Sequence, residues 1–294
     1  MSKFAYSKLQ HLADALFLNR NAKDVYFAIM TGYTSYSDAG GDGSGPVMTV
    51  AGFISNTEDW KRFDKEWAKV LAWAKVPYLH MNKFVAHIEP FANKKWERKE
   101  LREEFIGRLL NVIRNNVDFF PFISLSMDIW KTVNFEYKMK EERLSPFAVT
   151  ACGYVSIVEE WCRVKRVPWG QIEIIFEAGD DGGKGHFTHW CKKASNKTPI
   201  PKPGIQDENE EPSEYPLTPL QACDFAAWET RHAETGLSRD SSNYTFRRSF
   251  DELLLRLPVS NLNHQSWTIE GLRNLCATWR QETLDFSFPR PCLL

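Results

Sequence analysis

Two apolar segments joined by a glycine-rich turn constrain the start of this fold most strongly. Residues 33–38 and 47–54 (VMTVAGFI) have the length and the β-branched and aromatic content of short strands. The residues between them, GGDGSGP, favour a turn because glycine adopts backbone conformations that other residues avoid. The sequence therefore predicts a β-hairpin near the start of the chain.

Strands and long helices alternate after this hairpin. Residues 146–162 (PFAVTACGYVSIVEEWC) carry no charge before Glu159, which is typical of a buried helix. The spacing of apolar residues predicts the remaining elements: helices over 60–74 and 95–115, and strands over 119–128 (FFPFISLSMD) and 172–177 (IEIIFE). Alternation of this kind builds a mixed sheet covered by helices. We expect a single α/β domain over residues 1–294, with a helical N-terminal extension over 1–30.

A segment rich in proline and acidic residues interrupts this pattern. Residues 196–219 hold six of the 15 prolines, together with the acidic run DENEEPSE. Proline and repelling charges disfavour regular structure, so we predict a long loop over 196–217. Two interpretations of this loop remain open, a lid over the helix that follows it and a surface insertion without a role in the site.

The charge and the cysteines argue against several classes of protein. The chain has 294 residues with 37 Lys+Arg against 38 Asp+Glu, whereas proteins that coat DNA carry a large basic excess. The 6 cysteines form no CxxC pair, which favours a reducing cytoplasm over a secreted disulfide scaffold. No segment reaches the ~20 apolar residues of a membrane span. We therefore expect a cytoplasmic protein without a membrane partner, whose oligomeric state stays open.

The helix predicted after the loop carries a carboxylate where an apolar side chain is expected. Thr218 and Gln221 match a capping box, and Pro219 occupies the first helical position. Over residues 217–228 (LTPLQACDFAAW), Asp224 is the only charged residue. A carboxylate on an apolar face costs several kcal/mol unless a positive or hydrogen-bonding group meets it. We predict that Asp224 points at the edge of the sheet.

Two further acids stand at the ends of predicted strands. Asp38 and Glu177 each precede a glycine-rich turn, and the carboxyl ends of strands build sites in open α/β sheets. Carboxylates that lie together repel one another, and a divalent cation with hard oxygen ligands removes this repulsion. The three acids therefore predict a site for Mg²⁺ or Mn²⁺, with Asp180 and Asp181 of EAGDDGG as alternative ligands.

An ordered series of short motifs resembles a known family. In chain order the motifs are YSDAGG, VMTVAGFI, YLH, IIFEAGD and LQACDFAAW, spread over residues 33–232. They are similar to the ribonuclease H-like family catalogued as domain of unknown function 3800. Its members typically show a strand ending in Asp-Glu-Ser-Gly and a late helix of the form Leu-Gln-x-x-Asp. The helix motif is the most specific, and Ala39 stands where the family prefers glutamate.

The resemblance implies a ribonuclease H-like fold and an acidic cluster that, in active relatives, holds two metal ions for phosphodiester hydrolysis. It implies that Asp38 bridges both metals, Glu177 lies at a later strand end, and Asp224 lies on the helix. Asp180 is a further candidate ligand, and His80 is an auxiliary catalytic residue because imidazole titrates near neutral pH. We expect a nuclease or phosphodiesterase that depends on Mg²⁺ or Mn²⁺ and acts on RNA or DNA. The alternative is an inactive ribonuclease H-like module that binds nucleic acid or a protein partner.

Overall fold

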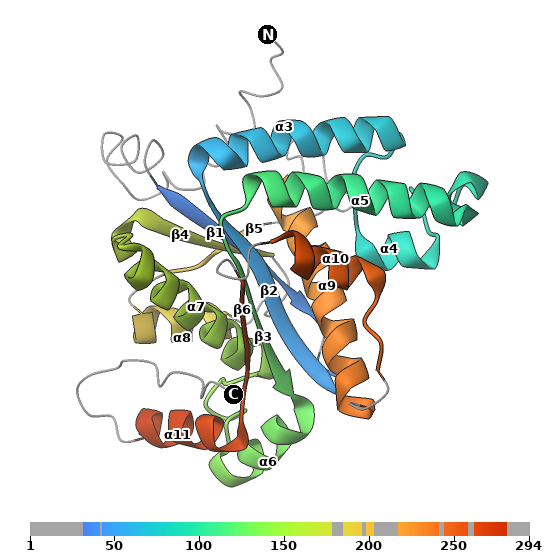
Figure 1. The fold of residues 1–294 in the computed structure, drawn as a ribbon. Helices are drawn as coiled ribbons and strands as arrows, with labels where there is room; N and C mark the ends of the chain where they lie inside the picture. The colour runs from blue at the N-terminus through green and yellow to red at the C-terminus, as the bar shows by residue number, and fades with distance from the viewer. Residues whose placement is uncertain are drawn as a thin grey trace.

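A six-stranded sheet lies at the centre of the molecule. The computed structural model describes residues 32–41, 43–177, 185–195, 198–202, 217–240, 244–257 and 262–280. The strand order is β5-β4-β1-β2-β3-β6 (Figure 1). The strands are β1 Tyr33–Gly40, β2 Val47–Asn56, β3 Phe120–Ser126, β4 Ile172–Glu177, β5 Ile200–Lys202 and β6 Leu262–Ser266. β2 is antiparallel to both of its neighbours and every other pair is parallel, so all strands except β2 share one direction.

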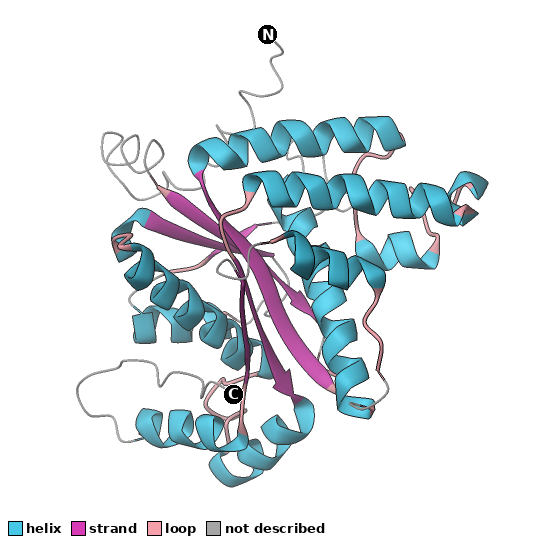
Figure 2. Ribbon diagram, in the orientation of Figure 1, coloured by secondary structure: helices cyan, strands magenta, loops and turns pink. Residues whose placement is uncertain are grey.

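Helices cover both faces of the sheet (Figure 2). One layer contains α3 Thr57–Ala74, α4 Met81–Ala86, α5 Lys99–Asn116, α9 Thr218–Arg239 and α10 Arg248–Arg256. The other layer contains α6 Met127–Tyr137, α7 Pro146–Lys165, α8 His186–Ser195 and α11 Ile269–Arg280. Each layer packs on its own cluster of buried apolar residues. β2 is therefore buried on both faces, which explains its nearly continuous apolar sequence.

The predicted α/β architecture, a mixed sheet opened by a hairpin and flanked by helices, is confirmed. β1 and β2 pair antiparallel from Tyr33 opposite Asn56 to Gly40 opposite Thr49. The buried helix α7 begins at Pro146, and the Ser145 hydroxyl accepts a 3.0 Å hydrogen bond from a backbone N–H of its first turn. The expected N-terminal extension over 1–30 lies outside the described residues.

Three predicted boundaries are wrong. The loop expected over 196–217 contains β5, which pairs with β4 at the edge of the sheet, where a strand tolerates proline. The strand expected over 119–128 ends at Ser126, because Met127, whose N donates to Pro46 O at 2.9 Å, is the first residue of α6. The helix expected over 95–115 is divided at Arg98, whose extended backbone separates a short 3₁₀ helix, Lys94–Glu97, from α5.

No described helix has the length and apolar character that crossing a membrane requires. The described cysteines are all buried free thiols, namely Cys152, Cys162, Cys191, Cys223 and Cys276. Apolar packing and hydrogen bonds therefore hold this part of the chain together.

A buried ion pair connects α9 to the start of α10. The Glu229 side chain is 1% exposed, its Oε1 accepts a 2.6 Å hydrogen bond from Ser249 Oγ, and its Oε2 lies 3.3 Å from Arg247 Nε. Burial raises the pKa of Glu229 above its ordinary value, although Ser249 and Arg247 oppose this shift.

We expect the raised pKa of Glu229 to reduce stability as the pH rises. A carboxyl that holds its proton more tightly in the folded state contributes stability fully below its ordinary pKa. This contribution is lost as the pH rises from the ordinary pKa through the folded one. The free energy of unfolding of the wild type should therefore fall relative to that of Glu229→Gln as the pH rises above about 4. Urea unfolding of both proteins measures this difference, and a difference that does not change with pH would contradict the prediction.

Candidate active site

The carboxyl ends of the parallel strands lie at one edge of the sheet. β1 and β4 are neighbours there, and their parallel register ends with Ser37 opposite Phe176. The next residues on the two strands are Asp38 and Glu177, so these acids occupy adjacent positions on adjacent strands. Edges of this kind are where open α/β sheets build their sites.

Both strand acids point to the sheet face that α9 covers. Side chains alternate along a strand, and Tyr36 and Ile175 belong to the apolar core under α3, α5 and α9. Asp38 and Glu177 follow Tyr36 and Ile175 by two residues, so they share that face. Asp38 is only 5% exposed, and its Oδ1 accepts a 2.6 Å hydrogen bond from Ala39 N.

Asp224 enters the same region from α9. Its Oδ2 accepts a 2.6 Å hydrogen bond from Met81 N and lies 3.4 Å from His80 Nδ1. Met81 begins α4, so its N–H has no acceptor within that helix. The side chain of Asp224 is 16% exposed. These contacts offset the cost of a carboxylate on an otherwise apolar helix face.

The charges of two acids, Asp224 and Glu177, both act on His80. Pairing with the Asp224 carboxylate raises the pKa of His80 most, burial lowers it, and the charges of Asp224 and Glu177 raise it further. The net result is a pKa above the ordinary value. The side chain of His80 is 30% exposed, so the imidazole also meets solvent.

One buried thiol is affected by the charges of all three acids. Cys223 is fully buried on α9. Burial raises the pKa of its thiol well above the ordinary value, and the charges of Asp38, Glu177 and Asp224 raise it further. A thiol held protonated in this way is a poor nucleophile. The charges of the three acids thus all reach this buried thiol.

The structure thus places Asp38, Glu177, Asp224 and His80 at one edge and on one face of the sheet. Asp180, the remaining candidate ligand, lies outside the described residues. Within the described ranges, no three Asp, Glu, His or Cys side chains form a group that holds a metal ion as placed. The donor chemistry fits a divalent cation, because carboxylate oxygens are the ligands that Mg²⁺ and Mn²⁺ prefer.

The predicted capping box at the start of α9 is wrong. The N-cap residue is Leu217, and no side chain caps this end of the helix. Thr218 instead donates its hydroxyl hydrogen to the Asp64 carboxylate of α3. The side chain of Gln221 also does not cap the helix, because it accepts hydrogen bonds from neighbouring elements.

Gln221 aligns α9 with the segment that carries His80, a role that the sequence did not reveal. Its side-chain Oε1 accepts hydrogen bonds from Trp67 Nε1 at 3.1 Å and from Leu79 N at 2.9 Å. The residue is 2% exposed. A glutamine within an apolar helix segment was the available signal, since a buried amide must find partners.

Arg231 places a cation at the turn that follows β1 and was also missed. It follows Asp224 on α9 by about two helical turns and packs against the turn after β1. A β-carbon on Gly40 would lie 2.9 Å from Arg231 Cβ, and one on Gly41 would lie 3.4 Å from Arg231 Cδ. No acid among the described residues forms an ion pair with Arg231. A guanidinium without a carboxylate partner suits a phosphate group.

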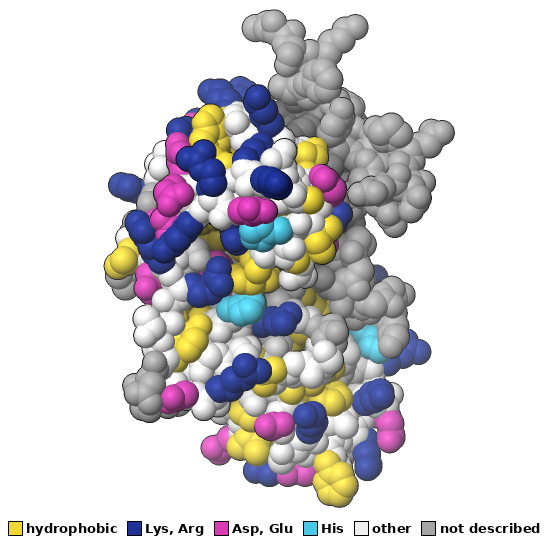
Figure 3. Space-filling model, turned by 90° about the vertical axis from the view of Figure 1, so that its right-hand side faces the viewer, with side chains coloured by type: hydrophobic (Ala, Val, Ile, Leu, Met, Phe, Trp, Pro, Cys, Tyr) yellow, Lys and Arg dark blue, Asp and Glu magenta, His cyan; other side chains and the backbone are white. Residues whose placement is uncertain are grey.

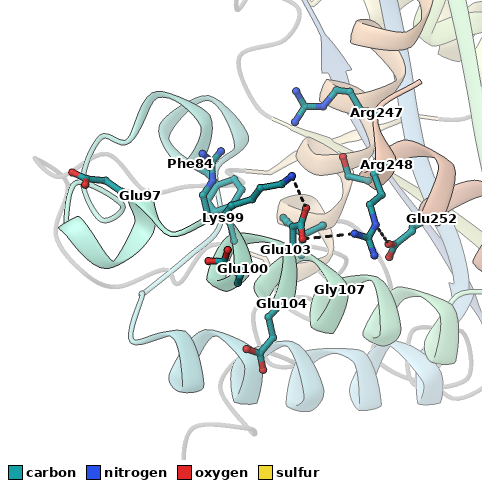
Figure 4. Close-up of a pocket in the computed structure, with 13 residues that line it drawn as sticks. Phe84, Glu97, Lys99, Glu100, Glu103, Glu104, Gly107, Arg247, Arg248 and Glu252 are labelled. Carbon is teal, nitrogen blue, oxygen red and sulfur yellow. Dashed lines mark hydrogen bonds and ion pairs between the residues drawn. The ribbon is translucent and has the colours of Figure 1, made fainter. Parts of the chain in front are cut away.

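A hollow of about 850 Å³ between α5 and α10 is lined by none of these acids (Figure 4). Four of its charged side chains pair with one another. Glu103 pairs with both Lys99 and Arg248, and Arg248 also pairs with Glu252. Charges that neutralise each other leave little attraction for a charged ligand, so we assign no function to this hollow.

Comparison with known proteins finds no matching family model, no matching curated protein and no matching solved structure. The chemistry of the acids and their neighbours is therefore the basis for assigning a function.

Proposed function

We propose that this protein is a metal-dependent nuclease or related phosphodiesterase with a ribonuclease H-like fold. The placement of Asp38 and Glu177 carries the proposal, because the two acids lie side by side at the carboxyl edge beneath the helix of Asp224. Their mutual repulsion disfavours such an arrangement unless a cation compensates it.

The strand order supports the fold assignment. The order β3-β2-β1-β4-β5, in which β2 alone is antiparallel, is the order expected for a ribonuclease H-like sheet, and β6 extends it beyond β3. Asp38 lies two residues before the end of β1 and Glu177 is the last residue of β4, both on the face that a late helix covers. The short motifs that resemble the family follow one another along the chain in the same order as these strands and this helix.

The chain's own residues have distinct parts in this proposal. Asp38, Glu177 and Asp224 would hold Mg²⁺ or Mn²⁺, which when bound supplies an activated water and stabilises the leaving oxygen. His80, whose pKa is raised by Asp224, would donate a proton to the departing group. Arg231 would orient a substrate phosphate at the turn after β1. Gln221 would keep α9 and the His80 segment aligned.

A binding module without catalysis is the second candidate. Ala39 stands where the resembling family prefers glutamate, and no described group of three ligands is complete as placed. In such a module the same edge would bind nucleic acid or a protein partner without cleaving it.

Thermal unfolding with and without Mn²⁺ distinguishes the two candidates. We expect saturating Mn²⁺ to stabilise the wild type by about 2–3 kcal/mol at a concentration 100 times its Kd. Asp38→Asn and Asp224→Asn should lose this gain while keeping their backbone hydrogen bonds, since asparagine retains an acceptor oxygen. Without Mn²⁺ the Asp38→Asn variant should be at least as stable as the wild type, because one repelling charge is removed.

Glu173→Gln is the matched control, since Glu173 shares the strand and the face of Glu177 but lies near the opposite end of β4. It should keep the gain from Mn²⁺ and the cleavage of labelled RNA, DNA and hybrid substrates. A wild type that gains no stability from Mn²⁺ or Mg²⁺, and whose cleavage is unchanged by Asp38→Asn, would exclude the proposed enzyme.

A further inference from the structure

An exposed phenylalanine lies in a hollow lined by lysines at the end of α6. Phe135 is 79% exposed and is the most exposed phenylalanine or tryptophan among the described residues. The hollow has a volume of about 510 Å³ and is lined by Lys131, Asn134, Phe135, Lys138, Lys140 and Glu141. Single exposed apolar side chains are common, but this ring has a basic surround.

Hydrogen bonds at the end of α6 fix the backbone that carries these lysines. Asn134 O accepts from Lys138 N at 2.8 Å, and Asn134 Oδ1 accepts from Lys140 N at 2.8 Å. Lys138 Nζ lies 5.4 Å from the centroid of the Phe135 ring. The ring and an ammonium group therefore face the same space before any ligand arrives, which lowers the entropic cost of binding.

The hollow carries an excess of positive charge. Its three lysines face one acid, Glu141. Lys131 also pairs with Asp128 at 3.4 Å, but the two side chains are 66% and 92% exposed, so the contact is weak in water. Lysine and arginine side chains spread over the face shown in Figure 3, interleaved with fewer acids. With three lysines against one acid in its lining, the hollow favours an anionic ligand.

The hollow is connected to the edge that carries the proposed active site. α6 follows β3 directly, and β3 runs parallel to β1, so the helix begins at the same edge as Asp38. Met127 N donates to Pro46 O at 2.9 Å, within the turn that follows β1. Phe135 lies eight residues further along α6, which corresponds to about 12 Å.

We infer that this hollow binds single-stranded nucleic acid, with one base stacked on Phe135 and the adjacent phosphates on the lysines. An unpaired base offers a free ring face to an aromatic side chain, whereas a base inside a duplex is already stacked. The inference rests on the proposed function, because it names single-stranded nucleic acid as the substrate class of the proposed active site at the carboxyl edge of the sheet.

Fluorescence anisotropy with a labelled single strand of about 16 nucleotides tests the hollow. The measurement is made in EDTA, with the full chain, so that binding is separated from cleavage. We expect Phe135→Ala to weaken binding about tenfold or more and Phe135→Trp to retain it. Lys138→Gln and Lys140→Gln should each lower the slope of log K against log salt by about 0.7.

Leu255→Ala is the matched control, because Leu255 is 83% exposed on α10 and does not line the hollow. It should bind as the wild type does. Equal affinity of the wild type and Phe135→Ala for the oligonucleotide would overturn the inference. It would also be overturned if the hollow bound anionic lipid vesicles or a protein but did not bind the oligonucleotide. Binding that depends on Phe135, without any cleavage once Mn²⁺ is added, would remove the proposed activity and leave the hollow intact.

Discussion

Replacing Gln221 by leucine is expected to lower the free energy of unfolding by about 3 kcal/mol. Leucine fills a similar volume but removes the acceptor that serves Trp67 Nε1 and Leu79 N. Both donors are in the interior, and each buried donor without a partner costs roughly 1–3 kcal/mol. Urea unfolding followed by tryptophan fluorescence measures the loss. The same variant should weaken stabilisation by Mn²⁺, because Leu79 precedes His80 in the segment that meets Asp224.

Trp67→Phe provides the control for this effect. Phenylalanine removes the indole donor, so only Leu79 N loses its acceptor when Gln221→Leu is added. The loss caused by Gln221→Leu should therefore be smaller by about 1 kcal/mol or more in the Trp67→Phe background. Equal losses in both backgrounds would mean that this hydrogen bond does not contribute to stability.

Gly40→Ala should separate α9 from the end of β1 and reduce stability by about 2–3 kcal/mol. A β-carbon at this position would lie 2.2 Å from Thr49 Oγ1 and 2.4 Å from Ala227 O. The second atom belongs to the backbone of α9, so the helix must move and no rotamer change relieves the contact. Because Asp38 and Asp224 lie on the two elements that separate, the variant should also lose most of its stabilisation by Mn²⁺. Thermal unfolding with and without the ion measures both effects.

Gly45→Ala is the matched control in the same turn. A β-carbon there meets no atom within 4 Å, so stability and the response to Mn²⁺ should stay close to those of the wild type. A Gly40→Ala protein as stable as Gly45→Ala would show that the close approach of α9 to β1 is not required by the fold.

Local signals predicted the elements whose ends are marked in the sequence. The hairpin of β1 and β2 has its glycine-rich turn, and α7 has Ser145 and Pro146 at its start. The start of α6 has no such mark, because Met127 follows Ser126 without a glycine or proline between strand and helix. β5 was missed because three residues that include a proline gain their strand conformation only by pairing with β4.

The candidate site, like the fold, was predicted only where the local sequence carries a signal. The strand-end position of Glu177 followed from the local pattern, whereas β1 extends two residues beyond the predicted end at Asp38. The adjacency of the two acids depends on the parallel pairing of β1 with β4, which no local feature encodes. The apolar surroundings of Asp224 revealed an unusual carboxylate. Its partner Met81 comes from a segment far away in the chain, so only tertiary packing discloses that contact. Arg231 was missed for the same reason.

The late position of α9 in the chain has a consequence for biosynthesis. β1 and β2 are translated long before α9, yet α9 covers the sheet face that includes Tyr36 and Phe53. A nascent chain on the ribosome therefore exposes the part of this face that α9 covers until the last third of the polypeptide emerges. Contacts between segments so distant in sequence form slowly and leave intermediates prone to aggregation. Chaperones that shield apolar strands should consequently raise the yield of folded protein during translation.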